Sequence, residues 1–453
     1  MPVLRTVGVA RHTAGVHSRN RPPGEPTVAD VVIALQVAAD RSARGDTAVA
    51  RSCARVLVRE PLDRLPDVVD RAVESVGVQA LARAWQLGWQ PLDLWQLARR
   101  RLPGAAIVHL VDLLAAEIAR YAEAAVAPAW SSQLRRLEVG VWWRTDRPLL
   151  GQRIARDGAD RREVLESVVD LLGMLHGLPG MSELIPPPGT PAAGAARTAG
   201  NAGSGNSAAA PPGAGPAPAD GVDPKMLVRV RALLAKAEST EFAEEADAFF
   251  AKAQELMTRY SLERAMLFAE GGGDGGGAGG RRIWLDAPYL SAKSMLINQV
   301  AMANRSKAVF HSGLGCVTVL GDEVDLELVE VLSTSLLVHA SGAMVAAGRQ
   351  LDWSGQSRTK SFRQSFLVSY ATRIGERLAV AAAATSEAMA GEVGDGRLLP
   401  VLAARTQEVE RLYESLFPRL RTKRVSVSNH AGWGAGRVAA DLADLDVRRA
   451  VGG

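Results

Sequence analysis

The chain has 453 residues, of which 47% are hydrophobic, 23% charged and 5% aromatic, and its formal net charge is +4. This length predicts two or three domains rather than one core. Few aromatic residues and abundant Ala and Gly favour Ala-rich helices and flexible linkers over a large β-sandwich. The mildly basic balance permits contact with nucleic acid without requiring it.

The cysteine content and the lack of targeting segments in the sequence both predict a cytoplasmic protein. The two cysteines, Cys53 and Cys316, fall in different predicted domains, so they form neither a disulfide framework nor a metal-ligand cluster. The N-terminal stretch has no apolar core of a signal peptide. We also find no run of about 18 apolar residues that would span a membrane. We therefore expect a soluble cytoplasmic protein that makes no membrane contact.

The N-terminal part of the chain predicts an arm followed by helices. Residues 1–27 are basic and without periodicity, which indicates a disordered arm. Residues 28–180 show apolar spacings of three and four, which predicts an all-helical domain. The breakers Pro61, Pro66, Pro91 and Pro103 divide it into roughly five to seven helices.

Six of the nine tryptophans lie in this helical region: Trp85, Trp89, Trp95, Trp130, Trp142 and Trp143. They could form a stacking platform for bases or a groove for a peptide. We favour the simpler interpretation that they are the core of a domain otherwise poor in large aromatic residues.

Two segments have the composition of linkers. Residues 186–224 are rich in Pro, Gly and Ala and cannot bury enough apolar area to offset the entropy of ordering, so we expect a disordered linker. Its end-to-end distance should be roughly 30–40 Å. Residues 271–280 form a short Gly linker.

Between these linkers, residues 225–269 predict a helical hairpin. The apolar residues of its first helix share one face, and those of its second helix form a stripe from Ala246 to Tyr260. Ser239 and Thr240 break the chain between the two helices and can cap the second one. Two short amphipathic helices bury too little area to be stable alone, so we expect them to pack on a neighbouring domain or a partner.

Residues 281–424 predict a small α+β domain, followed by a tail over 425–453. A helix near 292–303 precedes a β-hairpin made of AVFHSGL and CVTVLG, with Gly313 and Gly315 beside its turn. Asp322 can cap the helix that follows, and another helix starts near Ser361. The fold class is thus a multidomain, mainly α protein: helical N-terminal domain, long disordered linker, helical hairpin and small α+β C-terminal domain.

The hairpin KMLVRVRALLAKAESTEFAEEADAFFAKAQELMTRYSLERAML resembles the domain of unknown function 2786, a family found in bacteria, actinobacteria especially, and in their phages. Downstream, NQVAMANRSKAVF, TVLGDEVDLELVEVL and SFRQSFLVSYATRIGERL resemble the small α/β domain that usually accompanies it. The two resemblances cover roughly residues 224–380. The helices of 28–180 are similar to the N-terminal extensions of some actinobacterial members. The family implies this fold but no settled activity.

Three basic clusters are candidates for nucleic-acid or anion binding. Their members are Lys225, Arg229 and Lys236 on one flank of the hairpin; Arg358, Lys360, Arg363, Arg373 and Arg377 on or before the helix from Ser361; and Arg421, Lys423 and Arg424 in PRLRTKR. A half-buried Arg needs a carboxylate, phosphate or carbonyl partner for its five N–H donors. Internal pairing with Asp322, Asp325 or Glu330 is the alternative for the second cluster, and plain solvation is the alternative for the other two.

Catalytic signatures are missing from the sequence. It has no zincin histidine pair, no phosphate-binding loop ending in Lys-Ser/Thr and no nucleophile elbow. His311 and His339 share a predicted domain with Cys316, and a Cys/His pair can act as nucleophile and base, but chance placement is the better interpretation. NHAGWGAGR at 429–437 is a weak candidate for a phosphate loop and is better interpreted as a turn in the tail.

We therefore expect a non-enzymatic protein that binds the phosphate backbone of DNA or RNA through basic helix faces, without catalytic residues, metal or cofactor. One alternative is an interaction adaptor whose hairpin docks a protein partner. A less favoured alternative is an unrecognised metal-dependent hydrolase built on His311, His339 and acidic residues.

Overall fold

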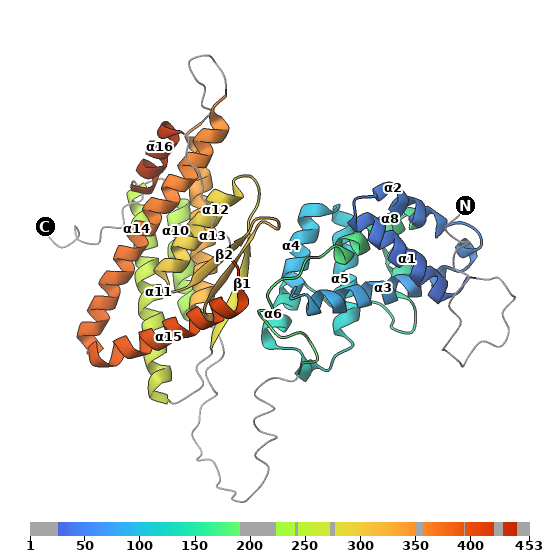
Figure 1. Cartoon of the computed structure of the whole chain (residues 1–453), viewed down its shortest axis with the longest axis horizontal. Helices are drawn as coiled ribbons and strands as arrows, with labels where there is room; N and C mark the ends of the chain where they lie inside the picture. The colour runs from blue at the N-terminus through green and yellow to red at the C-terminus, as the bar shows by residue number, and fades with distance from the viewer. Residues whose placement is uncertain are drawn as a thin grey trace, which may run out of the picture. The chain divides into compact units, whose positions relative to one another are not determined.

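The computed structural model describes residues 26–190, 223–240, 243–271, 277–348, 357–393, 395–420 and 429–441. Almost all of the expected arm, and most of the expected linker and tail, lie outside these residues. The described residues are mainly helical with one small sheet (Figure 1). They form two units, Met1–Gly180 with Pro187–Gly189 and Met181–Pro186 with Thr190–Gly453, which are considered separately below.

The first unit is all-helical, as expected for residues 28–180. Its helices are α1 (Val28–Ala43), α2 (Thr47–Val56), α3 (Pro66–Gln86), α4 (Pro91–Arg101), α5 (Gly104–Ile118), α6 (Pro128–Arg136), α7 (Leu149–Asp157) and α8 (Arg161–His176). Pro66 and Pro91 each open a helix, where a missing N–H costs nothing. Thr27 and Asp30 form a capping box that starts α1. The predicted breakers therefore fall at the boundaries of helices.

The tryptophans of this unit confirm the core interpretation in part. Trp89 and Trp130 are each 1% exposed, and Trp85 is buried with its ring edge-on to Trp130 at a centroid distance of 4.8 Å. Trp95, Trp142 and Trp143 are half-buried. The guanidinium carbons of Arg153 and Arg156 lie 4.3 and 4.5 Å from the centroid of the Trp142 ring. These guanidinium groups occupy the π-surface that a stacked base would need.

The second unit contains the hairpin and the α+β part. Its elements are α10 (Pro224–Ser239), α11 (Ala243–Gly271), β1 (Ala278–Trp284), α12 (Leu290–Ala303), β2 (Lys307–His311), β3 (Cys316–Asp322), α13 (Glu323–Ala346), α14 (Thr359–Val393), α15 (Asp395–Leu416) and α16 (His430–Asp441). The three strands form one antiparallel sheet in the order β1-β3-β2.

The predicted β-hairpin is confirmed, with His311 opposite Cys316 at its closed end. The first strand of the sheet was not predicted. β1 starts at Ala278, so the end of the expected Gly linker 271–280 is a strand. Its glycines have a packing reason, because a Cβ on Gly280 would lie 2.7 Å from Leu184 and 2.8 Å from Leu320. Glycine in a strand often marks such a close approach.

Helices cover both faces of this sheet. Alternate side chains of a strand point to opposite faces, so Val317 and Val319 of β3 join the main core, while Thr318 contacts His311 on the other side. α15 contacts all three strands. It reaches β2 through an ion pair of 2.7 Å between Lys307 and Glu410. β3 is consequently buried along nearly its whole length.

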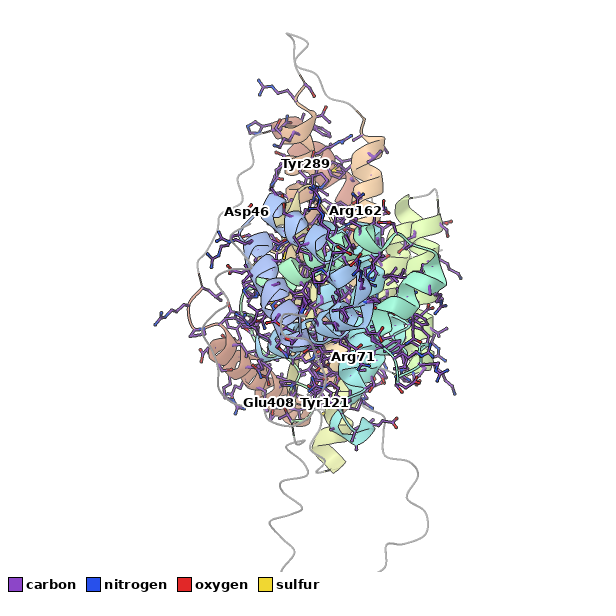
Figure 2. The ribbon with its side chains drawn as sticks, turned by 90° about the vertical axis from the view of Figure 1, so that its right-hand side faces the viewer. Asp46, Arg71, Tyr121, Arg162, Tyr289 and Glu408 are labelled. Carbon is purple, nitrogen blue, oxygen red and sulfur yellow. The ribbon has the colours of Figure 1, made fainter. Side chains whose placement is uncertain are left out.

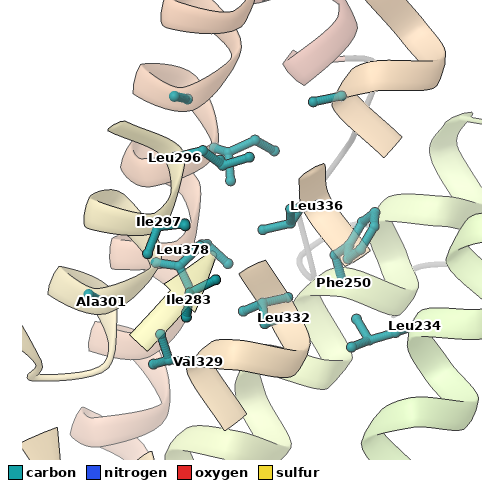
Figure 3. Packing of buried hydrophobic residues seen from close by; sticks show 14 of the residues in the cluster. Leu234, Phe250, Ile283, Leu296, Ile297, Ala301, Val329, Leu332, Leu336 and Leu378 are labelled. Atoms are coloured by element: carbon teal, nitrogen blue, oxygen red, sulfur yellow. The ribbon is translucent and has the colours of Figure 1, made fainter. Parts of the chain in front are cut away.

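The hairpin shares a single core with the α+β part. Figure 3 shows Leu234 of α10 and Phe250 of α11 beside Leu332 and Leu336 of α13. The same cluster continues through α12, α14 and the strands β1 and β3, where Ile297, Leu378 and Ile283 are all buried. The expectation that the two helices pack on a neighbour is confirmed.

Helix α13 is the one described helix that is long and apolar enough to cross a bilayer. It begins at the N-cap Asp322, whose side chain accepts a hydrogen bond from the backbone N–H of Val324. Leu332 and Leu336 of this helix lie in the core. A core helix of a soluble protein passes the same test, so this is weak evidence for a membrane span.

The interpretation of NHAGWGAGR as a turn in the tail is wrong. These residues form most of α16, which packs along α14. Asn429 accepts a hydrogen bond of 2.8 Å from the N–H of Gly432, which caps the helix. Cβ atoms on Gly432 and Gly436 would collide with the carbonyl oxygens of Phe362 and Phe366. The glycines therefore serve close helix packing rather than a loop.

Candidate functional site

The basic flank of α10 is exposed as a group. Asp223 caps the helix by accepting from the N–H of Lys225 at 2.9 Å, and Pro224 is its first residue. Lys225, Arg229 and Lys236 are all exposed. None of the three forms an ion pair with another described residue, although the Lys236 ammonium lies 5.7 Å from the centre of the Phe249 ring. The side chains predicted for this cluster are thus available to solvent.

Arg231 is a further cation on the exposed surface of α10 and was missed in the sequence. It is exposed and forms no ion pair with a described residue. Its position lies well around the helix from the other three, because successive residues turn by about 100°. The α10 basic face is therefore wider than predicted and consists of Lys225, Arg229, Arg231 and Lys236.

The second predicted cluster does not form one surface. Arg358 and Lys360 are exposed and Arg363 is half-buried. Arg373 pairs with Glu376 on its own helix at 2.8 Å. Arg377 is 8% exposed and donates to the carbonyl of Ala440 at the end of α16. The cluster divides into an exposed lead-in and arginines with internal partners.

The acids expected to pair with these arginines have other partners. Arg405 pairs with Asp322. Arg305 lies 3.8 Å from Asp325, and Arg281 lies 2.7 Å from Glu330. Internal pairing therefore holds for Arg373 and Arg377, but with a different set of groups. The third predicted cluster, Arg421, Lys423 and Arg424, lies outside the described residues.

His311 and His339 each contact a different polar group. Nε2 of His311 lies 2.8 Å from Oγ1 of Thr318. Nδ1 of His339 lies 2.9 Å from the hydroxyl of Tyr370. Cys316 is fully buried in β3. Over the described part of the chain, no group of three His, Cys, Asp or Glu side chains is placed to hold a metal ion.

A polar seam along α11 was not predicted. Gln254 is fully buried and donates to Asn304 at 3.0 Å and to Thr258 at 3.0 Å. Ser261, one helical turn further, accepts from Nη2 of Arg305 at 2.6 Å. Spacings of four and three residues place Gln254, Thr258 and Ser261 on one side of the helix. That spacing, next to the apolar stripe, was the available signal in the sequence.

The polar seam ends in a cavity of about 30 Å³ among α11, the α12–β2 turn, the start of α13 and α15. Its charged and hydroxyl lining groups are Ser261, Arg264, Arg305, Asp322, Asp325, Arg405, Thr406 and Glu408. Glu408 is labelled on α15 in Figure 2. Such a volume has room for about two water molecules.

Asp325 is the most perturbed acid of this cavity. It is 5% exposed, and burial raises its pKa to about 6, against the opposing effects of Arg305 and of a hydrogen bond from Ser261. A buried carboxyl with a raised pKa is kept at a cost in stability. Perturbed groups that line a cavity are candidates for function.

Arg305 reaches this cavity from a strained position. It follows Asn304, the C-cap of α12, and has a φ of 54°. Glycine is the usual residue at such a left-handed helix end, because any side chain is disfavoured there. The contacts of the guanidinium group account for an arginine at this strained position, because the group donates to Ser261 and lies beside Asp325.

These features define a class of protein, one in which a helical hairpin with a basic outer face is built into the core of a small α+β unit. Residues 225–264 match the family model described as "Protein of unknown function (DUF2786)". Over these residues the hairpin is similar to that family. Neither the curated proteins nor the solved structures contain a significant match to the chain.

Proposed function

We propose that this is a non-enzymatic, cytoplasmic protein that binds the phosphate backbone of nucleic acid through the basic face of α10. The observation that carries the proposal is that Lys225, Arg229, Arg231 and Lys236 are all exposed and form no ion pair with a described residue. Solvated cations on one helix can neutralise phosphates and release counterions, which drives binding without sequence selection.

The other exposed cations extend the proposal. Arg358 lies just before α14 and Lys360 lies in its first turn, and both are exposed. We assign the binding to the α10 basic face first and to this lead-in second. Arg363, half-buried beside them, is a weaker contributor.

Fluorescence anisotropy of the full chain against labelled single- and double-stranded DNA and RNA tests the proposal. Four phosphate contacts give a slope of about −3.6 in log K against log salt, so affinity should fall about 150-fold between about 50 and 200 mM salt. Absence of binding at the lower salt concentration would rule the proposal out.

A matched pair of variants locates the contact. Arg229→Ala with Lys236→Ala should reduce the salt slope by about 1.8. Arg71→Ala with Arg83→Ala removes the same charge from exposed positions on α3 of the first unit, and should change the slope little. Equal losses in both double variants would show a general charge effect and no role for α10.

An adaptor that binds a protein partner is the second candidate. Val228 lies within the same exposed surface of α10 and is 63% exposed, which an apolar contact would use. Binding of a protein through this surface should respond little to salt, because apolar burial is not screened. Val228→Asp would then abolish binding, whereas nucleic-acid binding would only weaken.

A further inference from the structure

We propose that the cavity among α11, α13 and α15 binds a single oxyanion of phosphate size, held by the guanidinium groups of Arg264, Arg305 and Arg405. This inference does not rest on the function proposed above. The three arginines come from three separate segments, α11, the α12–β2 turn and α15, and all line the same cavity. Guanidinium groups present forked N–H donors that match the oxygens of phosphate or sulfate.

The size of the cavity limits the ligand. A volume of about 30 Å³ has room for about two water molecules, which suits one oxyanion group and excludes a nucleoside. Thr406 lies at the exposed side of the lining on α15, where its hydroxyl donates to the carbonyl of Leu402 at 2.9 Å. The matching ligand is free phosphate or sulfate, or the terminal phosphate of a larger molecule that stays outside.

Two of the three arginines, Arg305 and Arg405, are positioned before any ligand arrives. Ser261 and Asp325 hold Arg305, whose backbone adopts the unfavourable left-handed conformation. Asp322, the N-cap of α13, holds Arg405. A guanidinium group has five N–H donors, so it can bond an acid and an oxyanion at the same time. Pre-positioned donors reduce the entropy lost on binding.

The charges that line the cavity link binding of the oxyanion to protonation of Asp325. Three arginines face the carboxyl groups of Asp322, Asp325 and Glu408. The polar groups around Asp325 come from several segments that line the cavity. They are Ser261 and Arg264 of α11, Arg305 of the α12–β2 turn, Asp322 at the N-cap of α13, and Arg405 and Glu408 of α15. When Asp325 takes up a proton, three cations face two carboxylates and the cavity gains a net positive charge. An oxyanion should therefore bind together with that proton.

Sulfate is the appropriate probe because it keeps its double charge across the relevant pH range. We would measure the thermal unfolding of the full chain in increasing sulfate, against chloride of equal ionic strength, at pH 5.5 and 7.5. If the protonated form binds, the apparent affinity for sulfate should be about 25-fold tighter at pH 5.5, from the fraction of Asp325 protonated at each pH. No stabilisation by sulfate over chloride at pH 5.5 would overturn the proposal.

Two adjacent residues of α15 give a matched test that leaves the ion pairs intact. Thr406→Glu places a negative charge in the lining and should abolish the effect of sulfate. Gln407→Glu adds the same charge at an exposed neighbour outside the lining and should leave the effect unchanged. Equal behaviour of the two variants would contradict the assignment.

Asp325→Asn tests the proton coupling and should bind sulfate equally at both pH values. Persistence of the wild-type pH dependence in this variant would overturn the coupling. Arg229→Ala with Lys236→Ala should leave the sulfate effect intact, which separates this cavity from the α10 basic face.

The binding affinities of oligonucleotides with 5′-phosphate and 5′-hydroxyl ends would show whether the oxyanion is the end of a nucleic acid or a free phosphate. A preference for the phosphorylated end that Thr406→Glu removes would support the cavity and identify a nucleic-acid terminus as its ligand. Equal affinity of the two ends, with the sulfate effect retained, would support the cavity as a site for a free or small-molecule phosphate.

Discussion

The guanidinium group of Arg377 in α14 donates a hydrogen bond to the backbone carbonyl of Ala440, the penultimate residue of α16. The last carbonyls of a helix have no partner within the helix and carry a partial negative charge. A buried cation at this place therefore fixes the end of α16 on α14. It also satisfies an arginine that the sequence left without an evident partner.

Arg377→Met should loosen the end of α16 while keeping the bulk of the side chain. Loss of a charged hydrogen bond from a buried position costs on the order of 2 kcal/mol. Hydrogen exchange should become faster at the last residues of α16 and stay unchanged in α1 to α8. Unchanged exchange in α16 would show that Arg377 does not hold the helix.

The glycines of α16 provide a second prediction with an internal control. Gly436→Ala would place its Cβ 2.2 Å from the carbonyl oxygen of Phe366, so the helix must move away from α14. We expect destabilisation of about 1–3 kcal/mol, as for overpacked sites. Gly434→Ala has open space around its Cβ and should be neutral or stabilising by up to about 1 kcal/mol through helix propensity. Chemical denaturation of the two variants measures this difference.

The buried amide pair of Gln254 and Asn304 should show strong coupling. Gln254→Leu leaves the Asn304 side chain with only the carbonyl of Val300 as its partner. A buried amide that loses a partner costs about 1–3 kcal/mol. In a double-mutant cycle with Asn304→Leu, the combined loss should be smaller than the sum of the single losses. Strict additivity would indicate that the pair does not act as a unit.

Asp325 should make the folded state less stable as the pH rises. Its pKa is about 6 when folded and near 3.8 when unfolded, so the folded state binds the proton more tightly. The stabilising contribution is complete below about pH 4 and is lost as the pH rises through about 6, a change on the order of 3 kcal/mol.

Asp325→Asn removes this dependence. The variant should therefore gain stability relative to the wild type between pH 4 and pH 7, even though Arg305 loses an ionic partner. Urea denaturation at the two pH values measures the change. An equal stability difference at both pH values would show that Asp325 does not titrate in this window.

Periodicity and breakers predicted much of the fold. The helical character of the first unit, the hairpin and the strands β2 and β3 follow from apolar spacing and from Pro and Gly positions. The described part of the first unit has eight α-helices, where five to seven were expected. β1 was missed because AGGRRIW has no alternation of apolar residues. The need for Gly280 is explained only by the side chains of Leu184 and Leu320, which lie far from Gly280 in the sequence. α16 was missed for a similar reason, since its glycines are required by the close approach of the α14 backbone.

The candidate sites were predictable only where a side chain faces solvent. Lys225, Arg229 and Lys236 share a flank of one helix, and a helical wheel identifies it. The cavity depends on Ser261, Arg305, Asp325 and Arg405, which lie up to 144 positions apart in the chain (405 minus 261). No spacing rule links such residues, because tertiary packing alone brings them together.

The shared core of the second unit has a consequence for the hairpin as a structural module. Residues 225–264 make up one wall of a core whose other walls are α12, α13, α14 and the sheet. Expressed by themselves, they would present Val230, Leu234 and Phe250 to water. To bury these side chains, the hairpin needs an apolar surface of matching shape from the rest of the chain or from another molecule. The hairpin is therefore one part of a larger folding unit. We expect that it does not fold without the apolar surface that completes this core.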